Sequence, residues 1–150
     1  MDDLERDRLL KEEYFKLQDQ YEDYDRRSLT IKGWVSAGAA TAIAVGTQKG
    51  DSTNLNMFFI VALLAGCFWY LEACWKTFQY ALQLRIREIE RHFRDDESAA
   101  PPLQMFVKWF EGYDRSLKQL CHAGTQSFVM LPYVLIIAIC LVMYTVALLT

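Results

Sequence analysis

A single glutamate follows the longest uncharged apolar run in the first half of the chain. Glu72 comes directly after MFFIVALLAGCFWYL at 57–71, and Lys76 lies four residues further on. A carboxylate in a membrane span is a functional-site candidate by default, because burying a charge in lipid is costly. Two interpretations follow. Glu72 side chains could form a ring at the mouth of an oligomeric pore, where they favour cations, or Glu72 could form an interfacial ion pair with Lys76.

Aromatic residues stand on both sides of Glu72, as in the belt where a helix leaves the bilayer. A crossing of ~20 residues that begins near Leu55 places this glutamate near the membrane boundary, not at the midplane. The predicted interfacial anchors are Trp69, Tyr70, Trp75 and Lys76.

No catalytic constellation accompanies this glutamate. The two histidines are His92, in a charged helix end, and His122, beside Cys121. Adjacent residues on a helix point in different directions, so Cys121 and His122 cannot pair with each other directly. The sequence has no HExxH, no Gly-rich phosphate loop and no GxSxG. We expect no enzymatic activity, no cofactor and no metal site, and we interpret the carboxylates at 95–97 as a solvated helix end.

Charge is segregated along the 150 residues, whose net charge is −3. Residues 1–32 hold seven Lys/Arg and ten Asp/Glu, whereas residues 128–150 hold none. FVMLPYVLIIAICLVMYTVALL at 128–149 exceeds the ~18 apolar residues that a bilayer crossing needs. No Lys/Arg cluster of the kind that binds nucleic acid is present. The acidic N-terminus does not resemble a signal peptide. The sequence therefore predicts a protein whose main partner is the lipid membrane.

The first predicted span, GWVSAGAATAIAVGT at 33–47, is short and made of small residues. Gly38, Ala42 and Gly46 recur every fourth position, a spacing that lets helix backbones approach closely in a membrane, so these are the helix-packing candidates. A turn at 48–56 joins this span to the next. The candidates for lining a pore or its mouth are Ser36, Thr41 and Glu72.

Amphipathic helices are predicted outside the spans. Apolar residues step by three and four from Leu10 to Tyr24, and again from Leu71 to Phe93, so the second helix should continue far beyond the membrane. A further amphipathic helix is predicted at 103–123, either packed on that extension, which we favour, or lying in the membrane interface. Its apolar side comprises Leu103, Phe106, Val107, Phe110, Leu117, Leu120 and Cys121.

The expected fold is an all-α membrane protein with transmembrane helices at about 30–47, 55–74 and 128–149. Eight Lys/Arg in 72–127 and seven in 1–32, against Lys49 alone in the turn, predict a cytoplasmic N-terminus and an outside C-terminus. The expected parts are a cytoplasmic helix at 1–31, a two-span hairpin at 32–75, a cytoplasmic helical region at 76–127 and the third span at 128–150.

Two segments carry a resemblance to known proteins: YFKLQDQYEDYDRRSLTIKGW and FWYLEACWKTFQYALQLRIREIE. Across 10–93, a polar helix, a two-span hairpin and a long cytoplasmic helix resemble small bacterial membrane proteins of unassigned function. The layout is similar to SLATT-type two-span effectors of anti-phage and conflict systems, to which 128–149 adds a third span. The resemblance implies a bacterial inner-membrane pore. It also implies a trigger, which would be a soluble signalling enzyme, a nucleotide or an oligonucleotide.

Two functions are compatible with these patterns. The first is a homo-oligomeric pore or ion channel gated through the cytoplasmic helices, because three spans are too few for one chain to enclose a water path. The second is a non-conducting membrane adaptor whose cytoplasmic helices dock a soluble partner.

Overall fold

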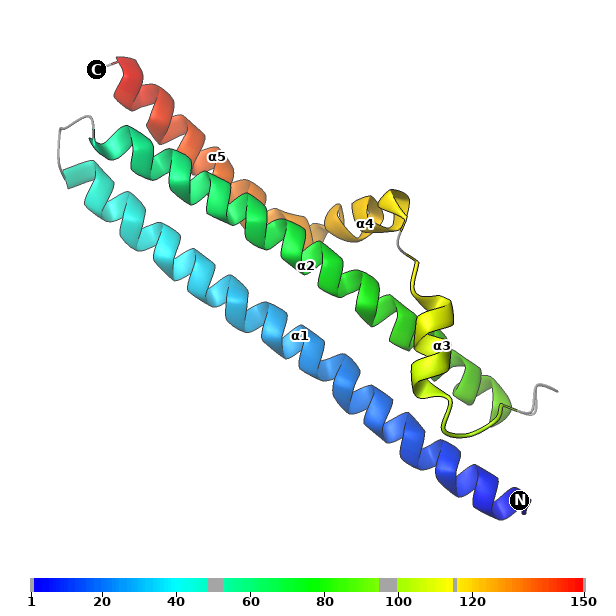
Figure 1. The fold of residues 1–150 in the computed structure, drawn as a ribbon. Coiled ribbons are helices and arrows are strands. Elements are labelled where there is room, and N and C mark those ends of the chain that lie inside the picture. The colour runs from blue at the N-terminus through cyan, green and yellow to red at the C-terminus, as the bar shows by residue number, and fades with distance from the viewer. Residues whose placement is uncertain (1, 49–52, 95–99, 115, 150) are drawn as a thin grey trace. The chain divides into compact units, whose positions relative to one another are not determined.

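The computed structural model describes residues 2–48, 53–94, 100–114 and 116–149, and these form helices and short connections without a strand. The centre of the predicted turn, 49–52, and the carboxylates at 95–97 lie outside the described residues. Figure 1 shows the five helices, which are α1 (Asp3–Gln48), α2 (Thr53–His92), α3 (Met105–Gly112), α4 (Leu117–Gly124) and α5 (Ser127–Leu149).

The helices α1 and α2 each join a polar segment to an apolar one without a break. The 46 residues of α1 include both the predicted N-terminal helix and the first span, and the helix is about 70 Å long at 1.5 Å per residue. The 40 residues of α2 run from the second span to His92. This confirms the prediction that the second helix continues past its apolar run, which ends at Leu71. No proline interrupts the helix.

Three helices of the described residues are long and apolar enough to cross a membrane: α1, α2 and α5. Of these, α5 is the most apolar and α1 the least. The prediction of three helices suited to a membrane is therefore confirmed at the level of length and composition.

The first of two compact units combines Met1–Arg27 with Trp75–Gln119. The two predicted seams meet in its core, because the same three-and-four spacing brings the apolar residues of each helix to one side. Tyr14, Tyr21 and Tyr24 pack at the edge of this core. Its buried residues are Leu10, Leu17, Leu82, Ile86, Ile89 and Ala100.

The single helix predicted at 103–123 is wrong, because the segment forms two short helices. The chain leaves the helical conformation at Tyr113, whose ψ is 101°. Asp114 then accepts hydrogen bonds from the backbone N–H (2.8 Å) and the hydroxyl (2.9 Å) of Ser116. Ser116 in turn caps α4 by accepting the N–H of Gln119 at 3.2 Å. The Ser-x-x-Gln spacing is the signature of a new helix start.

The second unit combines Ser28–Cys74 with Leu120–Thr150, so it contains the apolar segments of α1, α2 and α5. Small residues from α1 and α2 let large side chains of α2 and α5 interlock in its core. The buried members are Ala39, Phe58, Ala65, Tyr133, Ile136 and Cys140.

Of the three helix-packing candidates, Gly46 alone is at a close helix contact inside the second unit. A Cβ at Gly46 would lie 3.0 Å from Cζ of Phe58, whereas a Cβ at Gly38 would meet nothing within 4 Å. Gly38 and Ala42 instead line an apolar groove of about 350 Å³ between α1 and α2. Phe58 is 2% exposed, so it has little room to move away from Gly46.

We predict opposite effects of alanine at these two glycines. Gly38→Ala should raise the thermal stability of the second unit, since alanine in a helix is favoured over glycine by about 0.5–1 kcal/mol. Gly46→Ala should lower it, because overpacking against Phe58 costs about 1–3 kcal/mol and exceeds that gain. The measurement is the temperature at which buried Cys140 reacts with a thiol dye, with the other three cysteines replaced by serine. Equal shifts for the two variants would contradict the assigned contact.

Candidate functional site

Glu72 is 5% exposed and lies in a polar cluster that joins the three apolar helices of the second unit. Its Oε1 accepts a hydrogen bond from the Ser28 hydroxyl at 2.6 Å and pairs with Nζ of Lys32 at 2.7 Å. Lys32 also donates to the backbone carbonyl of Phe128 at 2.7 Å. A carboxylate from α2 and an ammonium from α1 thereby hold the start of α5. We call Ser28, Lys32, Glu72 and Tyr133 the Glu72 cluster.

Tyr133 from α5 completes the Glu72 cluster. Its side chain is 1% exposed and interacts electrostatically with Glu72. Apart from their interaction with each other, neither the Tyr133 hydroxyl nor Oε2 of Glu72 has a hydrogen-bond partner among the described residues. Buried polar atoms usually have a partner, and here each of these two groups has the other. The cluster is a polar centre in an otherwise apolar unit.

Lys76, predicted as an interfacial anchor paired with Glu72, is directed inward in the first unit. It is 9% exposed, pairs with Asp25 at 2.9 Å and donates to the side chain of Gln79. Gln79 in turn donates to the backbone carbonyl of Tyr21 at 3.0 Å. Lys76 thus fastens α2 to α1 within that unit, and Glu72 has its cation partner, Lys32, on α1.

The aromatic candidates beside Glu72 differ in exposure. Trp69 is half-buried and its Nε1 donates to the backbone carbonyl of Gly124 at 2.9 Å. Tyr70 is 63% exposed, which fits an interfacial anchor, and Trp75 is half-buried. The tryptophan that the sequence assigned to the lipid boundary therefore also fixes the end of α4 against α2.

Both hydroxyl-bearing candidates for lining a pore are exposed on α1. Thr41 donates its hydroxyl to the carbonyl of Ala37 at 2.9 Å, so this hydroxyl is satisfied inside its own helix. Ser36 is also exposed, five residues earlier and about 140° away around the helix. The structure separates this pair from Glu72, which is buried inside the unit.

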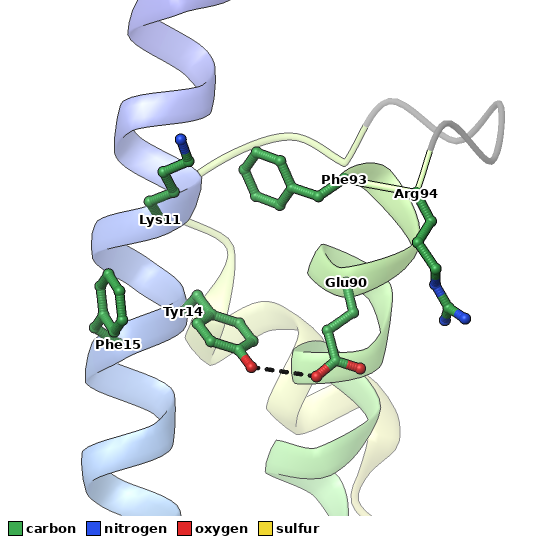
Figure 2. A pocket seen from close by; sticks show the side chains of 6 residues that line it. All are labelled: Lys11, Tyr14, Phe15, Glu90, Phe93 and Arg94. Atoms are coloured by element: carbon green, nitrogen blue, oxygen red, sulfur yellow. Dashed lines mark hydrogen bonds between the residues drawn. The ribbon is translucent and has the colours of Figure 1, made fainter.

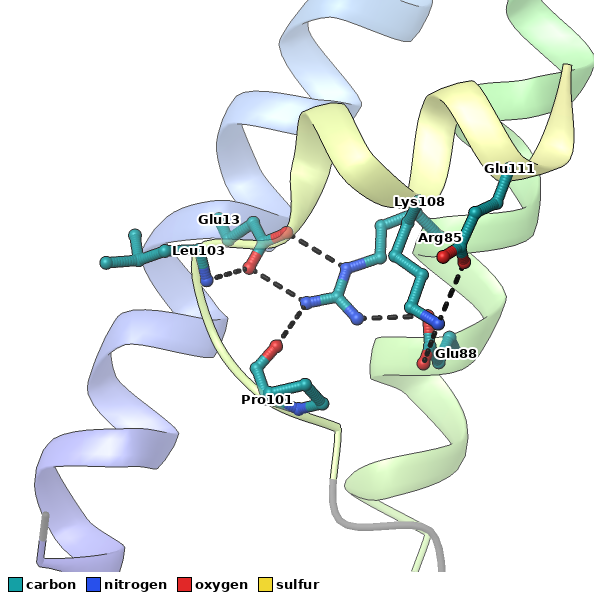
Figure 3. A network of polar contacts seen from close by, with 7 residues as sticks. All are labelled: Glu13, Arg85, Glu88, Pro101, Leu103, Lys108 and Glu111. Carbon is teal, nitrogen blue, oxygen red and sulfur yellow. Dashed lines mark hydrogen bonds and ion pairs between the residues drawn. The ribbon is translucent and has the colours of Figure 1, made fainter.

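The first unit contains a buried ion network that sequence reasoning missed (Figure 3). Arg85 is 1% exposed, and its guanidinium makes two parallel hydrogen bonds to Glu13, at 2.9 and 3.0 Å. It also donates to Glu88 at 3.0 Å and to the carbonyl of Pro101 at 2.8 Å. Burial alone lowers the pKa of Arg85, but the bonds to Glu13 and Glu88 outweigh it, so the pKa lies above its ordinary value. The side chain is a permanent buried cation.

Glu13 also fixes the chain before α3. Its Oε2 accepts the backbone N–H of Leu103 at 2.8 Å, and Leu103 has a φ of 61°, a conformation that L-residues rarely adopt. The hydrogen bond from its N–H to the Glu13 carboxylate holds this strained residue in place. A signal was available in the sequence, since Glu13 and Arg85 lie on or beside predicted apolar seams where a charge needs a partner.

A hollow of about 460 Å³ opens in the first unit where α2 ends (Figure 2). The hydroxyl of Tyr14 donates to Glu90 at 3.2 Å, and Nζ of Lys11 lies 5.6 Å from the centre of the Phe93 ring. Of the three charged side chains that line the hollow, Glu90 and Lys11 thus interact with other lining residues. We assign no ligand to the hollow. Phe15 and Arg94 complete the lining.

No protein-family model, curated protein or solved structure matches the chain. The proposed function therefore rests on the residues and their geometry.

We predict that Lys32→Met destabilises the second unit by about 3–5 kcal/mol, because it leaves Glu72 as an uncompensated buried charge. Adding Glu72→Gln should restore much of that loss, since an amide can still accept from Ser28 without carrying charge. The Cys140 thiol-reaction temperature measures both effects. A double variant no more stable than Lys32→Met would show that the carboxylate charge is not what Lys32 compensates.

Arg85→Met should abolish the slow hydrogen exchange of backbone amides in 100–112. It removes the cation that neutralises Glu13, and breaking a buried pair costs about 3–5 kcal/mol. Arg27→Met is the matched control, because the Arg27 side chain is 69% exposed in its pair with Asp23. Exchange measured by mass spectrometry on the full chain should be unchanged in the control. Equal exchange in the two variants would refute the structural role of Arg85.

Proposed function

We propose that the protein is a homo-oligomeric membrane pore in which the exposed face of the first span lies between copies or along the water path. One observation supports this: in the second unit α1 exposes a group of small or hydroxyl-bearing side chains, bordered by the exposed large side chains of Trp34 (74%) and Val45 (50%). This face, which we call the α1 small face, comprises Gly33, Ser36, Ala37, Ala40, Thr41 and Ala44.

The other two spans present a different surface. Exposed residues of α2 and α5 include Phe59, Ile60, Leu63, Leu135 and Val142, which are large and apolar, as suits contact with lipid tails. Small residues instead favour close helix packing, and the Ser36 hydroxyl favours a partner or water over hydrocarbon. Among the exposed surfaces of the three apolar segments, the α1 small face is thus the one that best suits close packing, and a second copy or a water-filled path would cover it.

Glu72 has a different role in this proposal from a ring at a pore mouth. Its contacts with Ser28 and Lys32 come from within the same chain, and 5% of the residue is exposed. A side chain so enclosed offers little charge to an ion outside the subunit. Glu72 supports the proposed pore by fastening α1, α2 and α5 together.

The remaining parts of the proposal rest on the sequence. The Lys/Arg distribution favours a cytoplasmic N-terminus in a bacterial inner membrane. A defence role, with a signalling enzyme or a nucleotide as trigger, depends on the layout of 10–93 and stays a prediction.

We predict that the purified protein makes liposomes permeable to small ions, and that Ser36→Leu/Thr41→Leu reduces this flux to the level of empty vesicles. Leucine narrows a water path and removes the hydroxyls. Val142→Leu on the exposed face of α5 is the matched control, and it should conduct like the unmodified chain.

Glu72→Gln should leave ion selectivity unchanged. Flux no greater than in empty vesicles, with insertion verified by flotation and protease protection, would favour the adaptor instead.

A further inference from the structure

The apolar groove between α1 and α2 lies within the second unit and has a floor of small residues. Ala39 is 5% exposed and Ala65 is 1% exposed, and a Cβ at Gly38 would meet nothing within 4 Å. Large side chains surround this floor, and Trp34 and Phe68 stand at one end. Among the described residues that line the groove, Trp34 alone has a polar side-chain atom. The groove therefore suits an apolar ligand that has a polar end.

The dimensions of the groove match a single hydrocarbon chain. From Trp34 to Ala42 the groove follows about 12 Å of helix rise, which is close to half of the ~30 Å hydrocarbon core of a bilayer. A volume of about 350 Å³ over that length gives a mean cross-section of about 30 Å². A chain of CH₂ groups whose carbons keep about 4 Å from their neighbours occupies roughly 20 Å². A helix about 10 Å across occupies roughly 80 Å², so it is too wide to enter.

We propose that this groove binds one acyl chain of a membrane phospholipid, with the polar end of the lipid beside Trp34. The Trp34 residue is 74% exposed, and its indole N–H can donate to an ester or phosphate oxygen, as tryptophan does at membrane interfaces. On α2, the predicted interfacial anchors Trp69 and Tyr70 directly follow Phe68. This end of the groove is thus at the predicted membrane boundary, and the groove extends from there into the hydrocarbon.

The location and the shape of the groove favour a lipid chain over a second copy of the protein. Both helices that form it are suited to cross a membrane, and its lining comes from their apolar segments, at 34–42 and 61–68. Trp34 and Leu64, which are 74 and 51% exposed, stand beside the small floor and would keep the surface of another helix away from it. A flexible chain can pass between them and restore the dispersion contacts that an unfilled groove would forfeit. Within a membrane such packing, and not exclusion of water, stabilises apolar contacts.

The test counts the phospholipids that the full chain retains when a mild detergent extracts it from phosphatidylcholine–phosphatidylglycerol vesicles. Native mass spectrometry should show one phospholipid on each unmodified chain. Gly38→Leu fills the groove and should abolish this retention, and Ala42→Leu should have the same effect. Gly66→Leu is the matched control, since a Cβ at Gly66 also meets nothing within 4 Å and this glycine is outside the lining. The control should retain its lipid.

Cross-linking locates the chain without a substitution, so it decides the question even where a variant does not insert. A retained phosphatidylglycerol with a diazirine in one acyl chain should attach within 34–42 or 61–68 of the unmodified protein. Cross-links confined to α5, or equal retention in Gly38→Leu and Gly66→Leu, would overturn the proposal. A lipid-free dimer that Gly38→Leu dissociates would also overturn it and would identify a second copy as the occupant. The proposal needs the membrane but not the pore, and neither measurement depends on ion flux.

Discussion

The structure depends on the neutralisation of buried charges between α1 and α2. In the first unit Glu13 pairs with Arg85 and Asp25 pairs with Lys76, and in the second unit Lys32 pairs with Glu72. Within the first unit, the pair nearer the start of α1 (Glu13) uses the later residue of α2 (Arg85), and the pair further along α1 (Asp25) uses the earlier one (Lys76). This order is that of two antiparallel helices. A heptad seam alone tolerates a shift of one repeat, but such a shift would separate each buried ion from its partner, at several kcal/mol each. The pairs therefore specify the register that the apolar seams leave open.

The apolar patterns predicted the elements well because they depend on local spacing. Leu10 and Leu17 on α1, and Ile86 and Ile89 on α2, are core residues as their three-and-four spacing indicated. The partner of a buried charge depends instead on which segments meet in space. Arg85 and Glu13 are 72 residues apart, and Glu72 is 44 residues from Ser28, so no spacing rule connects them. The sequence could show that these charges need partners but not which residues supply them.

The failure at 103–123 has a different physical origin. Apolar residues continue on one side through Leu117 and Cys121, so the periodic pattern predicts one helix. Local hydrogen bonding overrides that pattern, because Asp114 and Ser116 satisfy backbone donors that would otherwise continue the helix. Within α3, Trp109 and Met105 pack against the core of the first unit, whereas Phe106 and Phe110 are exposed. Capping residues were the available signal, and they take precedence over periodicity when the two conflict.

Burial of Glu72 also changes where an ion path through this protein would obtain its selectivity. The sequence alone left this glutamate two roles, as a charge at a pore mouth or as the partner of Lys76 in an interfacial ion pair. In the structure, Lys32 neutralises the Glu72 carboxylate and Ser28 donates a hydrogen bond to it. Glu72 therefore offers no unneutralised negative charge to a passing ion. If copies assemble around the α1 small face, the polar side-chain groups on that face are the hydroxyls of Ser36 and Thr41, which carry no charge. Such a path would discriminate by width and hydration more than by the sign of the ion, and Glu72 would determine whether the three helices hold the shape that keeps it open.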